Sequence, residues 1–295
     1  MASQRHQDWD RLLPRIERVV DLALEWLKGH SAGSPQEAVG EALAYRWYGG
    51  GLTPILHPDI YPLDGLIGVE GSVARLRTNV GAFARGTPAL DTLLYGERGT
   101  GKSSAVRGLL GEFSAQGLRL VGVQRDALAD LPAIFGALRG RAGRFVIYCD
   151  DLSFEEGDAS YKELKAALDG SLEARPENVL IVATSNRRRL IAEYMTENLE
   201  ASHSADGELH LGETTQEKIS LSDRFGLLLP FLGFNQETYL EIAEYHARLL
   251  GLDQILGADE RRTGALRFAL ERGTRSGRTA RHACIAMLQS ARDEA

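Results

Sequence analysis

Apolar runs alternate with helix-like segments in the middle of the chain, between residues 66 and 233. Two of these runs, at 145–149 and 179–183, are continuously apolar, as expected for strands that are buried on both faces of a sheet. Shorter apolar runs predict further strands at 93–95, 118–123 and 227–230. Because helical patterns separate the strands, we expect an α/β fold in which a parallel sheet lies between two layers of helices, a three-layer αβα core.

The first part of the chain carries helical patterns without strands. Residues 8–28 show helical spacing with one apolar face, and Gly29 follows as a stop signal. A second helix is expected over 34–48, because a Ser-Pro-Gln-Glu sequence can cap its start and three glycines follow its end. The stretch from residue 49 to residue 64 is rich in Gly and Pro, which predicts a linker.

Strand patterns also stop after residue 235. Helical patterns at 236–250, 259–271 and 279–292 predict a small all-helical C-terminal lid. The expected domains are an N-terminal helical segment with its linker at 1–60, an αβα nucleotide-binding domain at 61–233, and the helical lid at 234–295.

Composition narrows the class of protein. The 295 residues carry a formal net charge of −7 and a sequence pI near 5.6, which disfavours a protein that coats nucleic acid non-specifically and leaves open a local basic groove. Two cysteines, Cys149 and Cys284, are too few for a disulfide framework and indicate a reducing compartment. The first residues lack the apolar core of a signal peptide, and no stretch is long enough to span a bilayer. We therefore expect a cytoplasmic protein without membrane contact.

A glycine-rich sequence, GERGTGKSS, lies between the strand at 93–95 and a helical pattern that begins at Lys102. Glycines let successive backbone N–H groups turn toward a phosphate, and the helix N-terminus adds partial positive charge. In such a P-loop, Lys102 would reach the β- and γ-phosphates, and the Ser103 hydroxyl would bind Mg²⁺. A chance match is the alternative, but the strand before the pattern and the helix after it favour a phosphate site.

Two buried strands end in polar side chains. Asp150 and Asp151 follow the strand at 145–149, and Asn186 follows the strand at 179–183. Because the C-terminal ends of parallel strands meet at one edge of a sheet, we expect these side chains beside the P-loop. Asp150 would then hold Mg²⁺, Asp151 would orient and deprotonate the attacking water, and Asn186 would position that water. Taken singly, each of these strand ends could also be a solvated turn.

In this order, the motifs resemble those of AAA+ ATPases. The resemblance implies that Gly96–Ser103 is the Walker A segment, Asp150–Asp151 the Walker B pair, and Asn186 the sensor 1 residue. It also implies an arginine finger within Ser222–Gly226, which reads SDRFG, and a sensor 2 arginine within Ser276–Arg278.

A narrower resemblance is carried by stretches such as YRWYGG, LIGVEGSVARLRTNVGAF and ATSNRRRLIAEYM. They are similar to a bacterial single-AAA+ family labelled only as a domain of unknown function, and the likeness runs from residue 41 to the C-terminus. Under this resemblance, ATP or ADP would contact Ile67, Gly68, Gly96, Glu97, Arg98, Gly99, Thr100, Gly101, Lys102, Ser103, Ser104 and Arg278.

The resemblance also implies a homo-oligomer. Arg224 would reach into the nucleotide site of a neighbouring subunit, and it would join Lys102, Asp151 and Asn186 as a catalytic residue. Arg278 would contact the γ-phosphate and report the nucleotide state to the lid, with the neighbouring Arg275 and Arg281 as alternatives for this role. An ion pair between Arg224 and Asp223 within the chain is the alternative to the first of these roles.

The implied function is a Mg²⁺-dependent ATPase that remodels a partner protein, although the sequence specifies neither the client nor the number of subunits. Residues 123–130 lack the aromatic pore loop of protein unfoldases, which disfavours polypeptide threading. A nucleotide-gated DNA-binding switch is the alternative, with Arg187–Arg189 as a nucleic-acid contact or as a solvated cluster. A small-molecule kinase would leave the SDRFG segment and the lid unexplained. Residues 198–217 are polar and predict a long loop.

Overall fold

The computed structural model describes residues 42–152, 159–169, 174–186 and 224–293. Residues 42–295 form one compact unit, to which all of the following refers. The helix predicted at 8–28 and the first part of the helix predicted at 34–48 lie outside the described residues.

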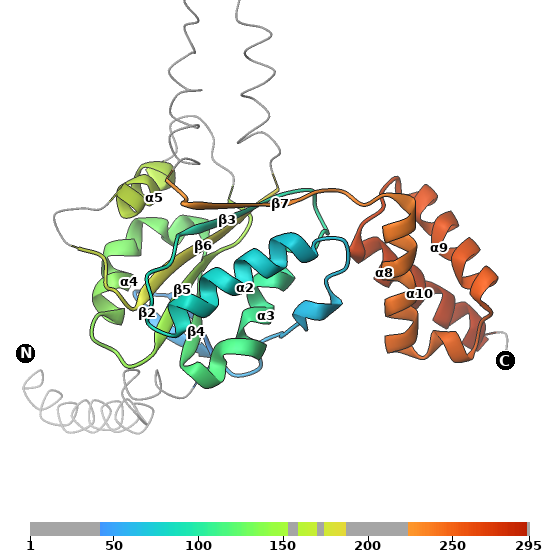
Figure 1. The fold of residues 1–295 in the computed structure, drawn as a ribbon, viewed down its shortest axis with the longest axis horizontal. Helices are drawn as coiled ribbons and strands as arrows, with labels where there is room; N and C mark the ends of the chain where they lie inside the picture. Colours follow the sequence, from blue (N-terminus) through green and yellow to red (C-terminus); the bar gives the residue numbers. More distant parts are fainter. Residues whose placement is uncertain (1–41, 153–158, 170–173, 187–223, 294–295) are drawn as a thin grey trace, which may run out of the picture. The chain divides into compact units, whose positions relative to one another are not determined.

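A seven-stranded sheet forms the centre of this unit, with the order β2-β1-β4-β5-β6-β3-β7 (Figure 1). Every neighbouring pair is parallel except β1 and β2, which are antiparallel. The strands are β1 (Ala44–Tyr48), β2 (Gly51–Ile55), β3 (Thr92–Gly96), β4 (Leu118–Val123), β5 (Arg144–Cys149), β6 (Val179–Ser185) and β7 (Leu227–Phe231). The αβα fold expected from the alternation of apolar runs is confirmed, and β3 lies in the interior of the sheet, between β6 and β7.

The hairpin β1–β2 corrects the sequence analysis. The helix predicted to end near Tyr48 is wrong for residues 44–48, which form a strand, and the predicted linker is wrong for residues 51–55. Gly49 and Gly50 both have positive φ, 58° and 77°, which gives the two-residue turn that joins antiparallel strands. Tyr45 and Trp47 are buried on one face of β1 while Arg46 and Tyr48 are exposed, a period of two that marks a strand.

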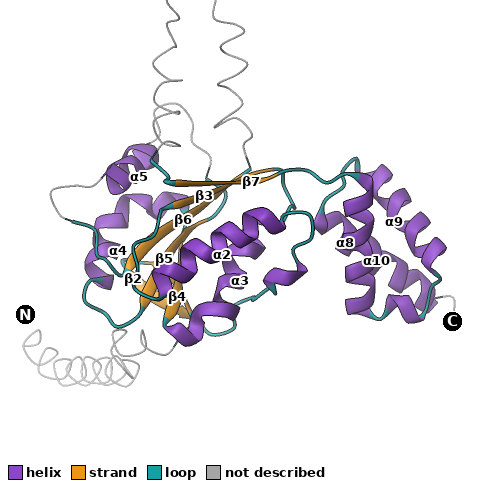
Figure 2. Ribbon diagram, in the orientation of Figure 1, coloured by secondary structure: helices purple, strands orange, loops and turns teal. Residues whose placement is uncertain are grey.

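Helices cover both faces of the sheet (Figure 2). α2 (Glu70–Ala84) and α3 (Lys102–Phe113) pack on one face, where residues of both helices share a core with Val146 and Val182 of the sheet. α4 (Leu131–Leu138) and α5 (Ala159–Asp169) connect β4 to β5 and β5 to β6. From β3 through α3 to β4 the chain moves across the sheet in one direction, and through α4 and α5 it moves back in the other. Because such crossovers are right-handed, α4 and α5 lie on the face opposite α3.

The C-terminal lid consists of α8 (Gln236–Leu250), α9 (Ala258–Arg272) and α10 (Gly277–Asp293), as the sequence predicted. Asn235 caps α8 by accepting a hydrogen bond from the backbone N–H of Thr238 at 2.8 Å. The three helices enclose their own core, in which Tyr239 and Cys284 are buried. Single turns of 3₁₀ helix occur at Leu63–Gly65, Ser114–Gln116 and Leu252–Gln254, with a longer one at Arg125–Asp130.

The two edge strands each contain a proline, Pro54 in β2 and Pro230 in β7. Proline cannot donate to a further strand, so both edges of the sheet are poor templates for pairing with another chain. Within the described residues, no helix has the length and apolar character required to cross a membrane.

Candidate functional site

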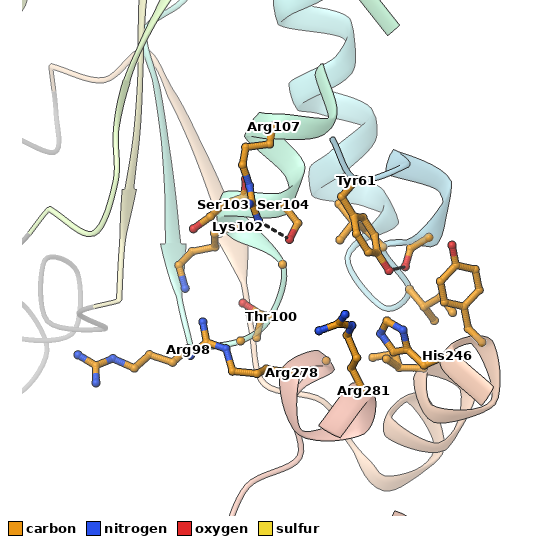
Figure 3. A pocket seen from close by; sticks show the side chains of 18 of the residues that line it. Tyr61, Arg98, Thr100, Lys102, Ser103, Ser104, Arg107, His246, Arg278 and Arg281 are labelled. Carbon is orange, nitrogen blue, oxygen red and sulfur yellow. Dashed lines mark hydrogen bonds between the residues drawn. The ribbon is translucent and has the colours of Figure 1, made fainter. Parts of the chain in front are cut away.

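A cavity of about 960 Å³ lies where the C-terminal ends of β3, β5 and β6 meet the lid (Figure 3). Its walls come from the loop after β3, from the ends of β5 and β6, from the segment at 59–67, and from α8 and α10. The topology therefore brings together the glycine-rich loop, the acidic pair and Asn186, as expected for strand ends at one edge of a parallel sheet.

The loop between β3 and α3 depends on three glycines. Gly96, Gly99 and Gly101 have φ values of 133°, 75° and 100°. A side chain at Gly96 would place its Cβ only 2.2 Å from the carbonyl oxygen of Phe231 on β7. A Cβ at Gly101 would lie 2.7 Å from the side chain of Leu66. These positions require glycine both for the backbone conformation and for the close approach of neighbouring chain.

Lys102 is the first residue of α3, and its side chain is 5% exposed. Its Nζ donates to the carbonyl oxygens of Gly96 at 3.0 Å and Glu97 at 2.6 Å. Burial lowers the pKa of Lys102 to about 8, although the nearby carboxylates of Asp151 and Asp150 act in the opposite direction. The ammonium group is thus held beside the loop in a site where its charge is poorly solvated.

The carboxylate of Asp150 is held by two hydroxyl groups. Ser103 Oγ donates to Asp150 Oδ1 at 2.9 Å, and Thr184 Oγ1 donates to the same oxygen at 2.6 Å. Burial alone would raise the pKa of Asp150, but these hydrogen bonds and the nearby Tyr148 hydroxyl outweigh it, and the pKa lies below its ordinary value. Asp150 is therefore an anion at neutral pH, next to the Ser103 hydroxyl.

Asp151 has the only positive φ among the described non-glycine residues, at 51°. Its backbone N–H donates to Thr184 Oγ1 at 2.9 Å, and its Oδ1 accepts from Nδ2 of Asn186 at 2.5 Å. Backbone strain of this kind persists only when surrounding contacts fix it. Thr184, to which the sequence analysis gave no role, thus holds both members of the acidic pair.

The lid contacts the glycine-rich loop directly. The backbone N–H of Gly277 donates to the carbonyl oxygen of Gly99 at 2.9 Å, and a Cβ at Gly99 would lie 2.7 Å from Ser276 Oγ. Ser276 also accepts from the backbone N–H of Thr279 at 3.1 Å, so it caps the start of α10. Arg278 and Arg281 follow one helical turn apart, and both line the cavity (Figure 3).

The far end of the cavity is more apolar and aromatic. Leu66, Ile67, Tyr245 and His246 line the cavity, and Tyr61 and His246 lie at the end away from Lys102 (Figure 3). Burial lowers the pKa of His246, and the charge of Arg281 lowers it further, so the imidazole is neutral at pH 7. An apolar pocket of this kind next to a phosphate-type loop suits a planar base.

Comparison with known families gives one match. Residues 40–290 match the family described as "Protein of unknown function (DUF815)". The chain belongs to this family. No curated protein matches the chain.

Among solved structures, the DUF815 chain is similar to RuvB of Thermotoga maritima, described as a Holliday junction branch migration motor. That likeness covers 78% of this chain and 71% of that chain, with 17% identity and a TM-score of 0.42. Two single-residue variants of the same protein give 16% identity with the same coverage and TM-score.

Most of the predicted site residues of the DUF815 chain line the cavity. These are Ile67, Arg98, Gly99, Thr100, Gly101, Lys102, Ser103, Ser104, Asp150, Asp151, Asn186 and Arg278. Gly68, Gly96, Glu97 and Arg224 are not among the described lining residues. Gly96 and Glu97 act through their carbonyl oxygens, which accept from Lys102, and Gly68 packs near Thr238 of the lid.

Several expectations concern residues outside the described ranges. They are the acidic stretch at 155–158, the arginines at 187–189, the long loop at 198–217, and Asp223 as a partner of Arg224. In the part of the chain that the structure describes, no group of three or more His, Cys, Asp or Glu side chains could hold a metal ion. A cation at this site would depend on Ser103 and Asp150 together with the phosphates of a nucleotide.

Residues missed by the sequence analysis lie mainly at the apolar end. Tyr245 and His246 follow Ile242 by three and four positions on α8. Arg281, three positions after Arg278 on α10, was an alternative to Arg278 in the sequence analysis, and both line the cavity. Helical spacing could have grouped each set on one helix face. It could not have shown that these faces turn toward the P-loop.

Proposed function

We propose that the protein binds ATP together with Mg²⁺ in the cavity between the αβα core and the lid, and hydrolyses it to ADP and phosphate. The observation that carries this proposal is the connected set of hydrogen bonds from Ser103 through Asp150 and Thr184 to Asp151 and Asn186, directly beside the glycine-rich loop. A metal ligand pair, a carboxylate base and a polar amide are the groups that phosphoryl transfer to water requires.

The residues of the cavity fit this chemistry. The N-terminus of α3 and the backbone of the glycine-rich loop would bind the phosphates, and Lys102 would exchange its two carbonyl partners for phosphate oxygens. Ser103 and Asp150 would hold the cation, which when bound neutralises charge on the β- and γ-phosphate oxygens. Asp151 would accept a proton from the attacking water, and Asn186, already in contact with Asp151, would orient that water.

The lid and a second copy of the chain would complete the site. Arg278 would contact the γ-phosphate from α10, while Ile67 and Gly68 would lie beside the base. We also propose that Arg224 acts in the site of a neighbouring subunit, as the resemblance to AAA+ ATPases implies. In such a homo-oligomer, hydrolysis would move the lid against the core and remodel a client protein in the cytoplasm. We further propose that 61–233 and 234–295 act as the two domains of this motion.

Steady-state ATP turnover tests the proposal. Lys102→Ala and Asp151→Asn are each expected to lower turnover by roughly 10²-fold or more. Lys165→Ala on α5 and Asp253→Asn in the lid are matched controls away from the cavity, and both should keep the wild-type rate. Turnover that is equal in the two site variants and their controls would exclude an ATPase at this site.

The role of Arg224 needs a measurement of mass as well as rate. Arg224→Ala should lower turnover by roughly 10³-fold or more if its guanidinium acts across a subunit interface. Adding a slowly hydrolysed ATP analogue should increase the mass of the wild-type particle. A monomer with full ATPase activity would rule out the shared site and leave ATP binding itself intact.

A further inference from the structure

Tyr148 carries a buried polar atom without a partner. In the part of the chain that the structure describes, its hydroxyl is the one buried side-chain polar atom without a hydrogen bond of good geometry, although it lies close to the side chains of Asp150, Ser103 and Thr184. The residue is 9% exposed and lies in β5, two positions before Asp150. Because a buried hydroxyl without a partner keeps its full desolvation cost, each such group needs an explanation.

Strand geometry places this hydroxyl on the side of the sheet where the cation would bind. Tyr148 and Asp150 are two residues apart, so their side chains leave the chain on the same face. Tyr148 packs in the core beneath α3, the helix whose first turn carries Ser103. The phenol O–H can donate a hydrogen bond.

Space for water exists next to this residue. Tyr148 and Asp150 both line a second cavity, of about 720 Å³, which Gly122 on β4 also lines. Asp150 lines the first cavity as well. Arg46, Gly122 and Tyr148 are register partners across β1, β4 and β5. A Cβ at Gly122 would have only the carbonyl oxygen of Tyr45 within 4 Å, at 3.7 Å, so the space above this glycine is open.

We propose that the Tyr148 hydroxyl is a positioning group of the metal site, and that it gains its hydrogen-bond partner from the hydration shell of a Mg²⁺ ion bound against Ser103 and Asp150. The inference rests on the proposed nucleotide site. Mg²⁺ keeps several of its water ligands when it binds to proteins, and those waters need hydrogen-bond partners of their own. Groups that hold a metal ligand from behind typically change metal affinity about 10- to 100-fold when they are removed.

Tyr148→Phe removes the hydroxyl and keeps the ring, and Tyr48→Phe is a matched control because Tyr48 is 75% exposed at the end of β1. The binding of a fluorescent ADP analogue would be measured in EDTA and during a Mg²⁺ titration. We expect Tyr148→Phe to leave affinity in EDTA within about twofold of the wild type and to raise the Mg²⁺ concentration for half-maximal effect about tenfold. Tyr48→Phe should change neither value.

Thermal unfolding without nucleotide and metal gives a second, independent readout. Removing an unpartnered buried hydroxyl should leave the melting temperature of Tyr148→Phe unchanged or raise it. A lower melting temperature would mean that the hydroxyl already has a partner, such as a water in the second cavity, and would overturn the inference.

The outcomes separate this inference from the proposed function. If the ADP analogue binds and Mg²⁺ acts equally on Tyr148→Phe and the wild type, the role of Tyr148 is wrong and the nucleotide site stands. Equal losses for Tyr148→Phe in EDTA and in Mg²⁺ would indicate a structural role and would also overturn it. If the wild-type protein binds no nucleotide, both proposals fail.

Discussion

The charge state of Lys102 predicts how nucleotide affinity depends on pH. Burial holds the pKa of this side chain at about 8, against an ordinary value of 10.5. Phosphate oxygens beside Nζ would favour the charged form and raise the pKa back toward its ordinary value. Above pH 8 the free protein must therefore take up a proton at Lys102 in order to bind the nucleotide with the same contacts.

The size of the effect follows from the two pKa values. At pH 7 the free protein is already protonated at Lys102, whereas at pH 9 about one molecule in ten is. If the pKa in the complex is at least 10.5, the Kd of the nucleotide should rise about tenfold between pH 7 and pH 9. Asp150 stays ionised and His246 stays neutral over this range, because both have lowered pKa values, so neither contributes to the change.

The assay is the binding of a slowly hydrolysed ATP analogue in EDTA, by fluorescence, at half-unit steps from pH 7 to pH 9. Lys102→Arg is the decisive control, because a guanidinium does not lose its proton in this range. Its affinity should be nearly independent of pH. Calorimetry in two buffers with different heats of ionisation should show uptake of close to one proton at pH 9 by the wild type. A flat wild-type profile, or a Lys102→Arg profile with the same slope, would refute this account of Lys102.

Three further results are expected. Between about pH 8 and 10.5 the unfolded chain binds more protons than the folded protein, because Lys102 loses its proton earlier in the folded state. The free energy of unfolding should therefore rise by up to about 3 kcal/mol across that window. Urea unfolding should show this rise in the wild type and not in Lys102→Met. Gly96→Ala should lower the free energy of unfolding by at least about 3 kcal/mol, because its Cβ would meet the backbone of β7 at 2.2 Å; a loss below 1 kcal/mol would contradict the geometry. Gly99→Ala should weaken nucleotide binding more than Gly140→Ala, which has a similar φ but no atom within 4 Å of the added Cβ; equal affinities would show that contact with Ser276 of the lid is unimportant for binding.

The fold was largely predictable because its strongest signals are local. The strand at 179–183 is apolar at every position, and in the structure every residue of β6 is buried. The helices of the lid have boundaries close to those predicted, because their ends carry ordinary capping signals such as Asn235 and Gly251. Where periodicity and end signals agree, the sequence alone is sufficient.

The hairpin β1–β2 shows where the same reasoning failed. A good N-cap at Ser34 led the predicted helix to continue as far as the glycines at 49–51. The alternation of Tyr45 and Trp47 with exposed neighbours was a strand signal, but five residues are too few to separate a strand from a helix by period alone. Pairing of β1 with β4 decided the outcome, and that contact joins residues about 75 positions apart in the chain.

Some residues of the candidate site could be predicted from the sequence, and others could not. The P-loop, the acidic pair and Asn186 could be identified because each lies at the end of a strand whose neighbours the topology dictates. Thr184 and His246 could not, since one acts through side-chain hydrogen bonds and the other through the docking of α8. Side chains recruited by tertiary packing leave no spacing pattern in the sequence.

Gly99 joins the glycine-rich loop to the lid. Its carbonyl oxygen accepts the backbone N–H of Gly277 at the start of α10, while the loop around it is the proposed phosphate contact. A Cβ at Gly99 would lie 2.7 Å from Ser276 Oγ, and a Cβ at Gly277 would crowd that same carbonyl oxygen at 3.2 Å. A change of the loop on phosphate binding would therefore shift the start of α10 or break its hydrogen bond. Since Arg278 is the next residue of that helix, this hydrogen bond would couple the loop to the proposed contact of Arg278 with the γ-phosphate.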